Sequence, residues 1–302
     1  MFLQLFSIFF NVVCPVFTLV LIGYALGPKL GIQYRSLSRT AYYILIPAFI
    51  FNVLSKIHID LTTAGRMIVG IGLIYLTTGI LGWLVARMLG LGREMAVAFL
   101  MTCIFGNVGN YGLALTQFRL GEAAMESGTV YMVTVNTLSF ACCILAAGWL
   151  RKGGFGALKN LIKTPGVVIL PVALIFPFTN TVPPTMVLRI TGLLGDAMIP
   201  MMLLILGLQL SEAGRLEWGW PAWTACGVRL IIGPVLGFLL IPLMGLSELQ
   251  TSAGILQSAM PAAVLTAIIA LEHDVAPTFV TSVVFAGTLL SLGSLTLVML
   301  LL

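Results

Sequence analysis

Long apolar runs, separated by short polar links, extend from one end of the chain to the other. Most runs are close to the roughly 20 residues that an α-helix needs to cross the hydrocarbon core of a bilayer. Charges, glycines and prolines gather in the links. The pattern predicts an all-α membrane protein with ten transmembrane helices, at residues 4–27, 39–55, 64–88, 94–118, 128–150, 166–180, 186–210, 219–244, 250–271 and 276–301.

The composition excludes a water-soluble globule. Of the 302 residues, 60% are apolar and 8% are charged, whereas about a quarter of an average soluble domain is charged. The five cysteines lie inside apolar runs, and they show no metal-binding spacing. We therefore interpret them as small core residues.

Basic residues are distributed unequally between the two sides of the predicted bundle. The links after even-numbered spans, with the adjoining span ends, carry four of them, Lys56, Arg66, Arg119 and Arg189. This asymmetry places the odd links in the cytoplasm and both termini outside. Because the basic residues form no single stripe, we expect no nucleic-acid partner. The ten basic residues in the links after odd-numbered spans are Lys29, Arg35, Arg39, Arg87, Arg93, Arg151, Lys152, Lys159, Lys163 and Arg215.

The longest link, residues 151–165, divides the chain into two sets of five spans, residues 1–150 and 166–302. Two sets with an odd number of spans cross the membrane in opposite senses, so a shared fold would make them an inverted repeat. A shift of 153 residues places Pro47 on Pro200, each preceded by Ile, and Val108 on Pro261. The sequence thus predicts a 5+5 inverted repeat.

Two predicted spans contain residues that are hostile to a helix. Three glycines and two asparagines lie within residues 106–112 of the fourth span, and Pro261 lies in the ninth. Within lipid, an interrupted helix is tolerated only where it lines a cavity or is buried in protein. We therefore predict helix breaks at Gly106, Gly112 and Pro261. The alternative is that these residues only allow close packing or a kink.

A pair of broken helices is suited to binding an organic anion. Each half-helix N-terminus offers free N–H groups and about half a positive charge. Asn107 and Asn110 add neutral donors, which cost less to bury than charges do. Asn136 and Gln257 lie near the breaks, although each could instead make one structural hydrogen bond. The predicted substrate-binding residues are Asn107, Gly109, Asn110, Asn136, Gln257, Ser258, Pro261, Ala262 and Arg229.

Other polar residues within the spans leave alternatives open. Arg229, near the middle of the eighth span, either binds the substrate anion or pairs with Asp196 or backbone carbonyls to hold helices together. Asp196 could couple a proton, but it lies near a helix end, where solvation is more common. Gln209 is interpreted as a packing residue. The sequence Glu272-His273-Asp274 is interpreted as a solvated turn and not as a metal or proton site.

Five segments in order along the chain resemble the auxin efflux carrier family of bacterial membrane transporters, within the bile acid/arsenite/riboflavin transporter superfamily. The resemblance is strongest in the second and fifth of them. One departure is that Leu113-Ala114-Leu115 stand where bacterial relatives often have a proline, which predicts a less sharp break in the fourth helix. The segments are Leu45–Phe51, Gly106–Leu113, Ile199–Leu210, Arg229–Pro234 and Ser258–Ala263.

The resemblance implies that the fourth and ninth helices cross. It also implies a scaffold made of spans 1, 2, 6 and 7, and a moving transport part made of spans 3–5 and 8–10. Relatives carry malate- or malonate-type dicarboxylates or the indole carboxylate auxin, in the bacterial inner (plasma) membrane or in plants. A homodimer formed through the scaffold is a further implication of the family.

No catalytic motif and no nucleotide-binding loop appears in the sequence, so we expect neither an enzyme nor a cofactor or metal. The sequence predicts a secondary carrier that moves small organic anions across the lipid bilayer by alternating access. A Na⁺- or H⁺-coupled carrier or antiporter of similar architecture is one alternative. The absence of an acid beside the predicted breaks argues against a cation antiporter. A membrane sensor that does not transport is another alternative, which would need a larger partner-binding surface than these short links offer.

Overall fold

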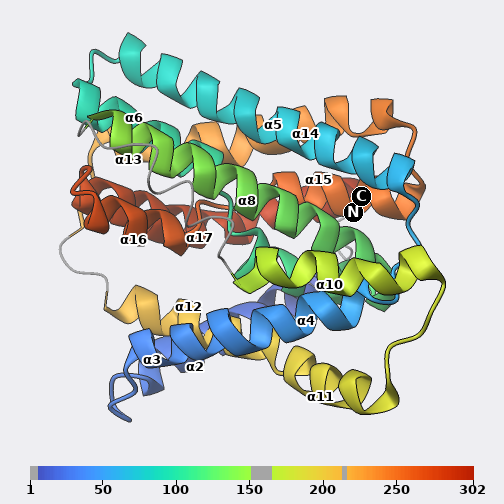
Figure 1. Ribbon diagram of the computed structural model, residues 1–302. Coiled ribbons are helices and arrows are strands. Elements are labelled where there is room, and N and C mark those ends of the chain that lie inside the picture. The colour runs from blue at the N-terminus through green and yellow to red at the C-terminus, as the bar shows by residue number, and fades with distance from the viewer. Residues whose placement is uncertain (1–5, 151–164, 213–215) are drawn as a thin grey trace.

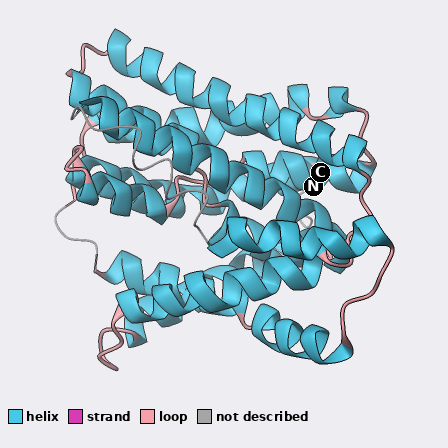
Figure 2. Cartoon of the chain, in the orientation of Figure 1, coloured by secondary structure: helices cyan, strands magenta, loops and turns pink. Residues whose placement is uncertain are grey.

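The structure is a computed structural model, and it describes residues 6–150, 165–212 and 216–302. Within these residues all the regular elements are helical (Figures 1 and 2). The elements are η1 (Phe9–Val13), α2 (Cys14–Leu26), α3 (Tyr34–Thr40), η2 (Ala41–Leu45), α4 (Ile46–Leu54), α5 (Leu61–Met88), α6 (Arg93–Ile104), η3 (Val108–Gly112), α7 (Leu113–Leu120), η4 (Glu122–Ala124), α8 (Met125–Leu150), α10 (Pro165–Thr179), α11 (Thr185–Asp196), α12 (Met198–Ser211), α13 (Trp220–Gly227), η5 (Val228–Ile232), α14 (Gly233–Leu240), η6 (Pro242–Met244), α15 (Glu248–Ser258), α16 (Val264–Glu272) and α17 (Pro277–Leu301).

Seven helical stretches in the described chain are long and apolar enough to cross a membrane without interruption. The other three predicted spans also coincide with helices, but α10 is shorter, and the fourth and ninth are each divided into two pieces. The protein is therefore an all-helical, multi-pass membrane protein. The seven stretches are Phe6–Leu26, Ser36–Leu54, Leu61–Met88, Glu122–Leu150, Thr185–Ser211, Trp220–Met244 and Pro277–Leu301.

Three of the long helices contain a single π-helical turn that a proline explains. Pro15, Pro47 and Pro234 each stand two residues after the end of such a turn, which is η1, η2 or η5. Proline has no N–H to donate and its ring displaces the carbonyl four residues earlier, so the preceding turn widens. A fourth π-turn, η3, has Ala114 at the corresponding position.

The helices form two groups (Figure 1). In one group α2 packs on α12, and α4 packs on α10 and α11. The α2–α12 contact is close because Gly23 and Gly207 have no side chains: a Cβ at position 207 would collide with the backbone carbonyl of Val20. In the other group α5, α6 and α8 pack together and meet α13–α17. The two interrupted spans lie in this second group.

Candidate functional site

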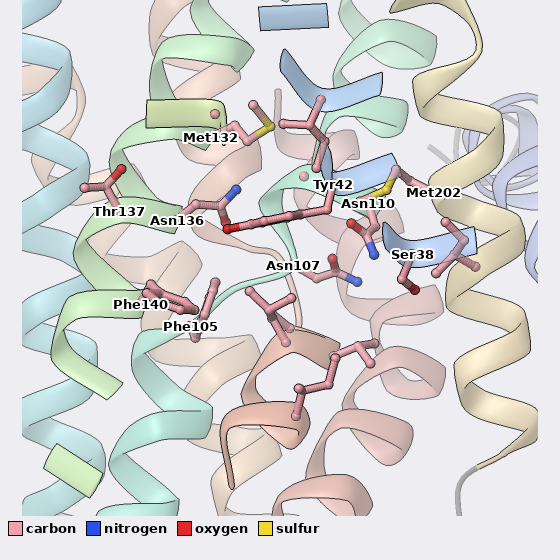
Figure 3. A pocket seen from close by; sticks show the side chains of 18 of the residues that line it. Ser38, Tyr42, Phe105, Asn107, Asn110, Met132, Asn136, Thr137, Phe140 and Met202 are labelled. Atoms are coloured by element: carbon pink, nitrogen blue, oxygen red, sulfur yellow. The ribbon is translucent and has the colours of Figure 1, made fainter. Parts of the chain in front are cut away.

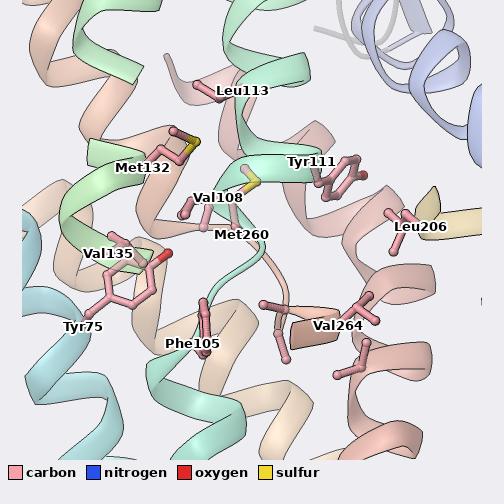
Figure 4. Packing of buried hydrophobic residues seen from close by; sticks show 14 of the residues in the cluster. Tyr75, Phe105, Val108, Tyr111, Leu113, Met132, Val135, Leu206, Met260 and Val264 are labelled. Carbon is pink, nitrogen blue, oxygen red and sulfur yellow. The ribbon is translucent and has the colours of Figure 1, made fainter. Parts of the chain in front are cut away.

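The two interrupted spans meet each other through their backbones. Gly106 and Ala262 form an antiparallel bridge. The Asn107 N–H donates to the Pro261 carbonyl at 2.8 Å, and the Ala263 N–H donates to the Phe105 carbonyl, also at 2.8 Å. These bonds satisfy backbone groups that the interruptions free and that lipid could not satisfy. Figure 4 shows buried side chains from several helices packed around this point.

The interruption in the fourth span covers residues 105–107. Gly106 lies within this interruption, and Pro261 lies within the interruption of the ninth span, residues 259–263. Gly112 has helical dihedral angles (φ −63°, ψ −42°) and continues η3 into α7, so the interruption does not extend that far. Gly112 instead allows a close approach, because a Cβ there would collide with Oε1 of Gln257.

A cavity of about 450 Å³ lies beside the paired interruptions and reaches across to the first group of helices. Its walls come from α3, η2 and α4, the residues around the fourth-span interruption, α8, α10, α12 and α16. Figure 3 shows the side chains of Asn107, Asn110, Asn136 and Tyr42 gathered around it. Of the predicted substrate-binding residues, those that line the cavity are Asn107, Gly109, Asn110 and Asn136.

Asn107 holds the interruption with its backbone, and the residue is also part of the cavity wall. Its carbonyl accepts hydrogen bonds from the N–H groups of Tyr111 and Gly112. The residue is 4% exposed, and among the described residues its Nδ2 atom has no hydrogen-bond acceptor. Because an unpaired buried donor costs about 1–3 kcal/mol, this amide is suited to a ligand with an acceptor oxygen.

The rest of the cavity is mostly apolar, with neutral polar groups set into it. Aromatic and methionine side chains form much of the wall, and the amides of Asn110, Asn136 and Gln209 are also part of it. The lining includes one acidic and one basic residue, Glu272 and Arg39, and both are exposed at the rim. Helix α16 begins at the wall, at Val264. A helix N-terminus there favours negative charge.

Arg229 does not line the cavity but lies directly behind its wall. It is 1% exposed. Its Nε donates to the Met260 carbonyl at 2.8 Å, and its Nη1 donates to the Cys103 carbonyl at 3.3 Å. Its Nη2 donates to the Tyr75 hydroxyl at 2.6 Å and to the Ser258 carbonyl at 3.2 Å. The structure therefore places Arg229 among backbone carbonyls, and none of these bonds goes to Asp196.

The remaining predicted residues of the ninth span also lie outside the cavity lining. The Gln257 carbonyl accepts a 2.8 Å hydrogen bond from the Tyr75 hydroxyl, and its Nε2 donates to the Thr116 hydroxyl at 3.3 Å. The Ser258 hydroxyl donates a hydrogen bond to the backbone carbonyl of Ile255 within its own helix. Pro261 and Ala262 contribute to the backbone pairing described above. These residues connect the interruption to the helices behind it.

Several lining residues were not predicted as part of the site. Tyr42, Met202 and Thr137 come from three different spans, and Gln209 was expected only to pack. The local sequence around these residues does not mark them as part of a site, because they come together only when the helices pack. A tyrosine and a glutamine within apolar runs are the features that could have drawn attention to Tyr42 and Gln209.

The charged residues away from the cavity form no second site within residues 6–150, 165–212 and 216–302. His273 and Asp274 lie in a turn after α16. No group of three or more His, Cys, Asp or Glu side chains that could hold a metal occurs in the described ranges. Near the opposite end of the spans, His58 Nδ1 pairs with a carboxylate oxygen of Glu126 at 3.0 Å.

Comparisons with known proteins identify relatives of this chain. The chain is 28% identical over 294 residues to a protein named "Uncharacterized transporter" from Methanothermobacter thermautotrophicus, which covers 94% of this chain and 95% of that relative. It is 26% identical over 298 residues to "Uncharacterized transporter MJ1031" from Methanocaldococcus jannaschii, with 93% and 95% covered. A segment of 116 residues is 28% identical to "Protein PIN-LIKES 7" from Arabidopsis thaliana, covering 38% of this chain and 29% of that protein.

A family model described as "Membrane transport protein" matches residues 8–152 and 155–299, which is nearly the whole chain. The match and the relatives confirm the family that the sequence motifs indicate. The chain belongs to this membrane transport protein family, the auxin efflux carriers, and is a multi-pass membrane transporter.

Proposed function

We propose that the protein is a secondary carrier for small organic anions, of the dicarboxylate or auxin-like carboxylate type, and that the substrate binds in the cavity beside the paired interruptions. The observation that carries this proposal is the buried Nδ2 donor of Asn107 at the cavity wall, without an acceptor in the described chain. A carboxylate oxygen is a strong acceptor for such a donor.

The electrostatics of the wall support an anion over a cation. The N-terminus of α16 contributes a partial positive charge, and the side chains beside it are neutral amides or apolar groups. Acidic residues within membrane spans commonly mark the pathway of a transported cation. The acidic residue in the lining, Glu272, is exposed at the rim.

We further propose that all ten helical segments cross the membrane as a 5+5 inverted repeat, with residues 1–150 as the first half and 166–302 as the second. The contacts of the first group support this arrangement. If spans 1 and 2 correspond to spans 6 and 7, the α2–α12 contact corresponds to the α4–α10 contact, and both are present. The two segments matched by the family model also divide inside the 151–165 link, most of which lies outside the described residues.

In this proposal the first group of helices is the scaffold and the second is the moving transport part. The cavity lies between them, as alternating access requires. Its lining residues Arg39, Gln209 and Glu272 adjoin links that the basic residues assign to the cytoplasm. The described conformation is then inward-facing, in the plasma membrane with both termini outside. A homodimer formed through the scaffold is part of the proposal on the strength of the family alone.

Uptake into proteoliposomes tests the proposed function. The purified protein is offered a mixture of small mono- and dicarboxylic acids, and the acids that enter are identified by mass spectrometry with and without a pH gradient. We expect selective entry of one class of acid, lost in Asn110→Ala. Asn52→Ala is the matched control, because Asn52 bonds Lys56 near the end of α4 and does not line the cavity.

Two results would contradict the proposal. Entry of no acid under either condition would shift the assignment to a cation carrier or a sensor that does not transport. Entry that is equally fast in Asn110→Ala and the wild type would leave the protein an anion carrier but move the site elsewhere.

A further inference from the structure

Arg229 is a buried cation that is held by neutral oxygens. Three of its hydrogen bonds go to backbone carbonyls and one goes to a tyrosine hydroxyl. Its guanidinium carbon also lies 4.3 Å from the centre of the Tyr75 ring, where the ring face attracts a cation. An unpaired buried charge is strongly unfavourable. The carbonyls that receive these bonds are therefore what makes the position of Arg229 tolerable.

These carbonyls belong to the ends of both half-helices that precede the interruptions. Cys103 lies in the last turn of α6, Ser258 is the last residue of α15, and Met260 follows α15 within the interruption. A helix C-terminus carries about half a negative charge. In carriers with interrupted helices, such carbonyl ends are where Na⁺ or H⁺ is bound. Here both ends already hold the guanidinium group of Arg229.

The surrounding backbone is shaped to fit this guanidinium. A Cβ at Gly106 would lie 2.5 Å from Nη2 and closer still to the Tyr75 hydroxyl. On the other side, a Cβ at Gly233 would lie 3.4 Å from Nη1 and 2.6 Å from the Ser258 carbonyl. Glycine at both positions leaves room for the charged group between the half-helices. Because Gly106 also lines the cavity, the charge is separated from the substrate site by one layer of backbone.

We propose that Arg229 is a built-in cation which occupies the carbonyl site that a coupling ion takes in other carriers, and which fixes a positive charge behind the anion site. This inference rests on the proposed function. In it Arg229 is a positioning residue that does not touch the substrate. A carrier built in this way needs no Na⁺ or H⁺ bound between the half-helices, and its anion selectivity depends on the charge of Arg229.

Ion replacement in proteoliposomes tests the inference first on the wild-type protein. We expect the uptake rate of the transported acid to change by less than about twofold when N-methylglucamine replaces Na⁺ and when the pH gradient is collapsed at constant membrane potential. A loss of about tenfold or more in either condition would overturn the inference. It would leave the proposed function intact, whereas entry of no acid at all would refute the proposed function itself.

Substitutions then separate a charge role from a packing role. Arg229→Met keeps most of the side-chain volume and removes the charge, and we expect uptake to fall by about tenfold or more. We expect Arg229→Lys to retain more activity. Millimolar guanidinium chloride is the decisive probe on Arg229→Ala, which removes the whole side chain and leaves space for the free ion. We expect guanidinium to restore part of the uptake, and to raise the Tm, of Arg229→Ala but not of the wild type. Wild-type uptake in Arg229→Met, or no response of either the uptake or the Tm of Arg229→Ala to guanidinium, would show that the charge has no such role.

Discussion

The crowding around Gly106 leads to a quantitative prediction for Gly106→Ala. The added methyl group would lie 2.5 Å from Nη2 of Arg229 and nearer still to the Tyr75 hydroxyl. Both neighbours are buried and held by hydrogen bonds, so neither can move freely. Overpacking a core costs about 1–3 kcal/mol and losing a hydrogen bond to a charged group about 1.5–3 kcal/mol, so we expect a destabilisation of about 2.5–6 kcal/mol.

The assay is thermal unfolding of the purified protein in detergent, followed by intrinsic fluorescence. At roughly 2 °C per kcal/mol, Gly106→Ala should lower the Tm by at least about 5 °C. Gly109→Ala is the matched control from the same segment. Its methyl group would meet Met132 Sδ at 3.6 Å, an ordinary contact, and alanine favours the helical backbone of η3. Equal Tm values for the two variants, or a lower Tm for Gly109→Ala, would refute the reasoning.

Two further predictions concern the contact between α2 and α12 and the start of α5. Gly207→Ala should destabilise the protein by about 1–3 kcal/mol, because the added methyl group would collide with the Val20 carbonyl. Gly192→Ala is the control and should not destabilise the protein, because there is open space around Gly192. The Tm values of the two variants check this prediction, and equal Tm values would contradict it. Asp60 caps α5, and the hydrogen bond from the Thr63 hydroxyl, together with backbone N–H groups, holds the pKa of its carboxyl below the usual value. Its charge-dependent contribution is therefore fully present above the unfolded pKa of about 3.9 and is lost as the pH falls through the lower folded pKa. The Tm difference between the wild type and Asp60→Ala should thus shrink on acidification below that pH, and a difference that grows would contradict this account.

The helices could be predicted closely from the sequence, because each predicted span coincides with helical structure. The largest errors lie at helix starts. The fifth span was predicted to begin at residue 128, whereas α8 begins at Met125 and includes Glu126, which pairs with His58. The second span was predicted to begin at residue 39, but α3 begins at Tyr34. In both cases the apolar pattern stops at charged residues, whereas the helix continues beyond its apolar core.

The site could be predicted only in part. The residues hostile to a helix located both interruptions, because glycine and proline act on their own backbone. The cavity wall opposite them could not be predicted, since the contribution of Tyr42 and Met202 depends on how distant helices pack. The hydrogen-bond acceptors of Arg229 could not be predicted from the sequence either. Every residue has a carbonyl, so no side-chain pattern marks those of Cys103 and Met260 as the acceptors.

The most direct test of the central claim is an experimental structure determined with the transported acid bound. The account predicts the acid in the cavity beside the paired interruptions, with a carboxylate oxygen within about 3.2 Å of Asn107 Nδ2 and with Arg229 still bonded to the carbonyls behind the wall. An acid bound elsewhere in the protein, with the cavity unoccupied by it, would contradict the account.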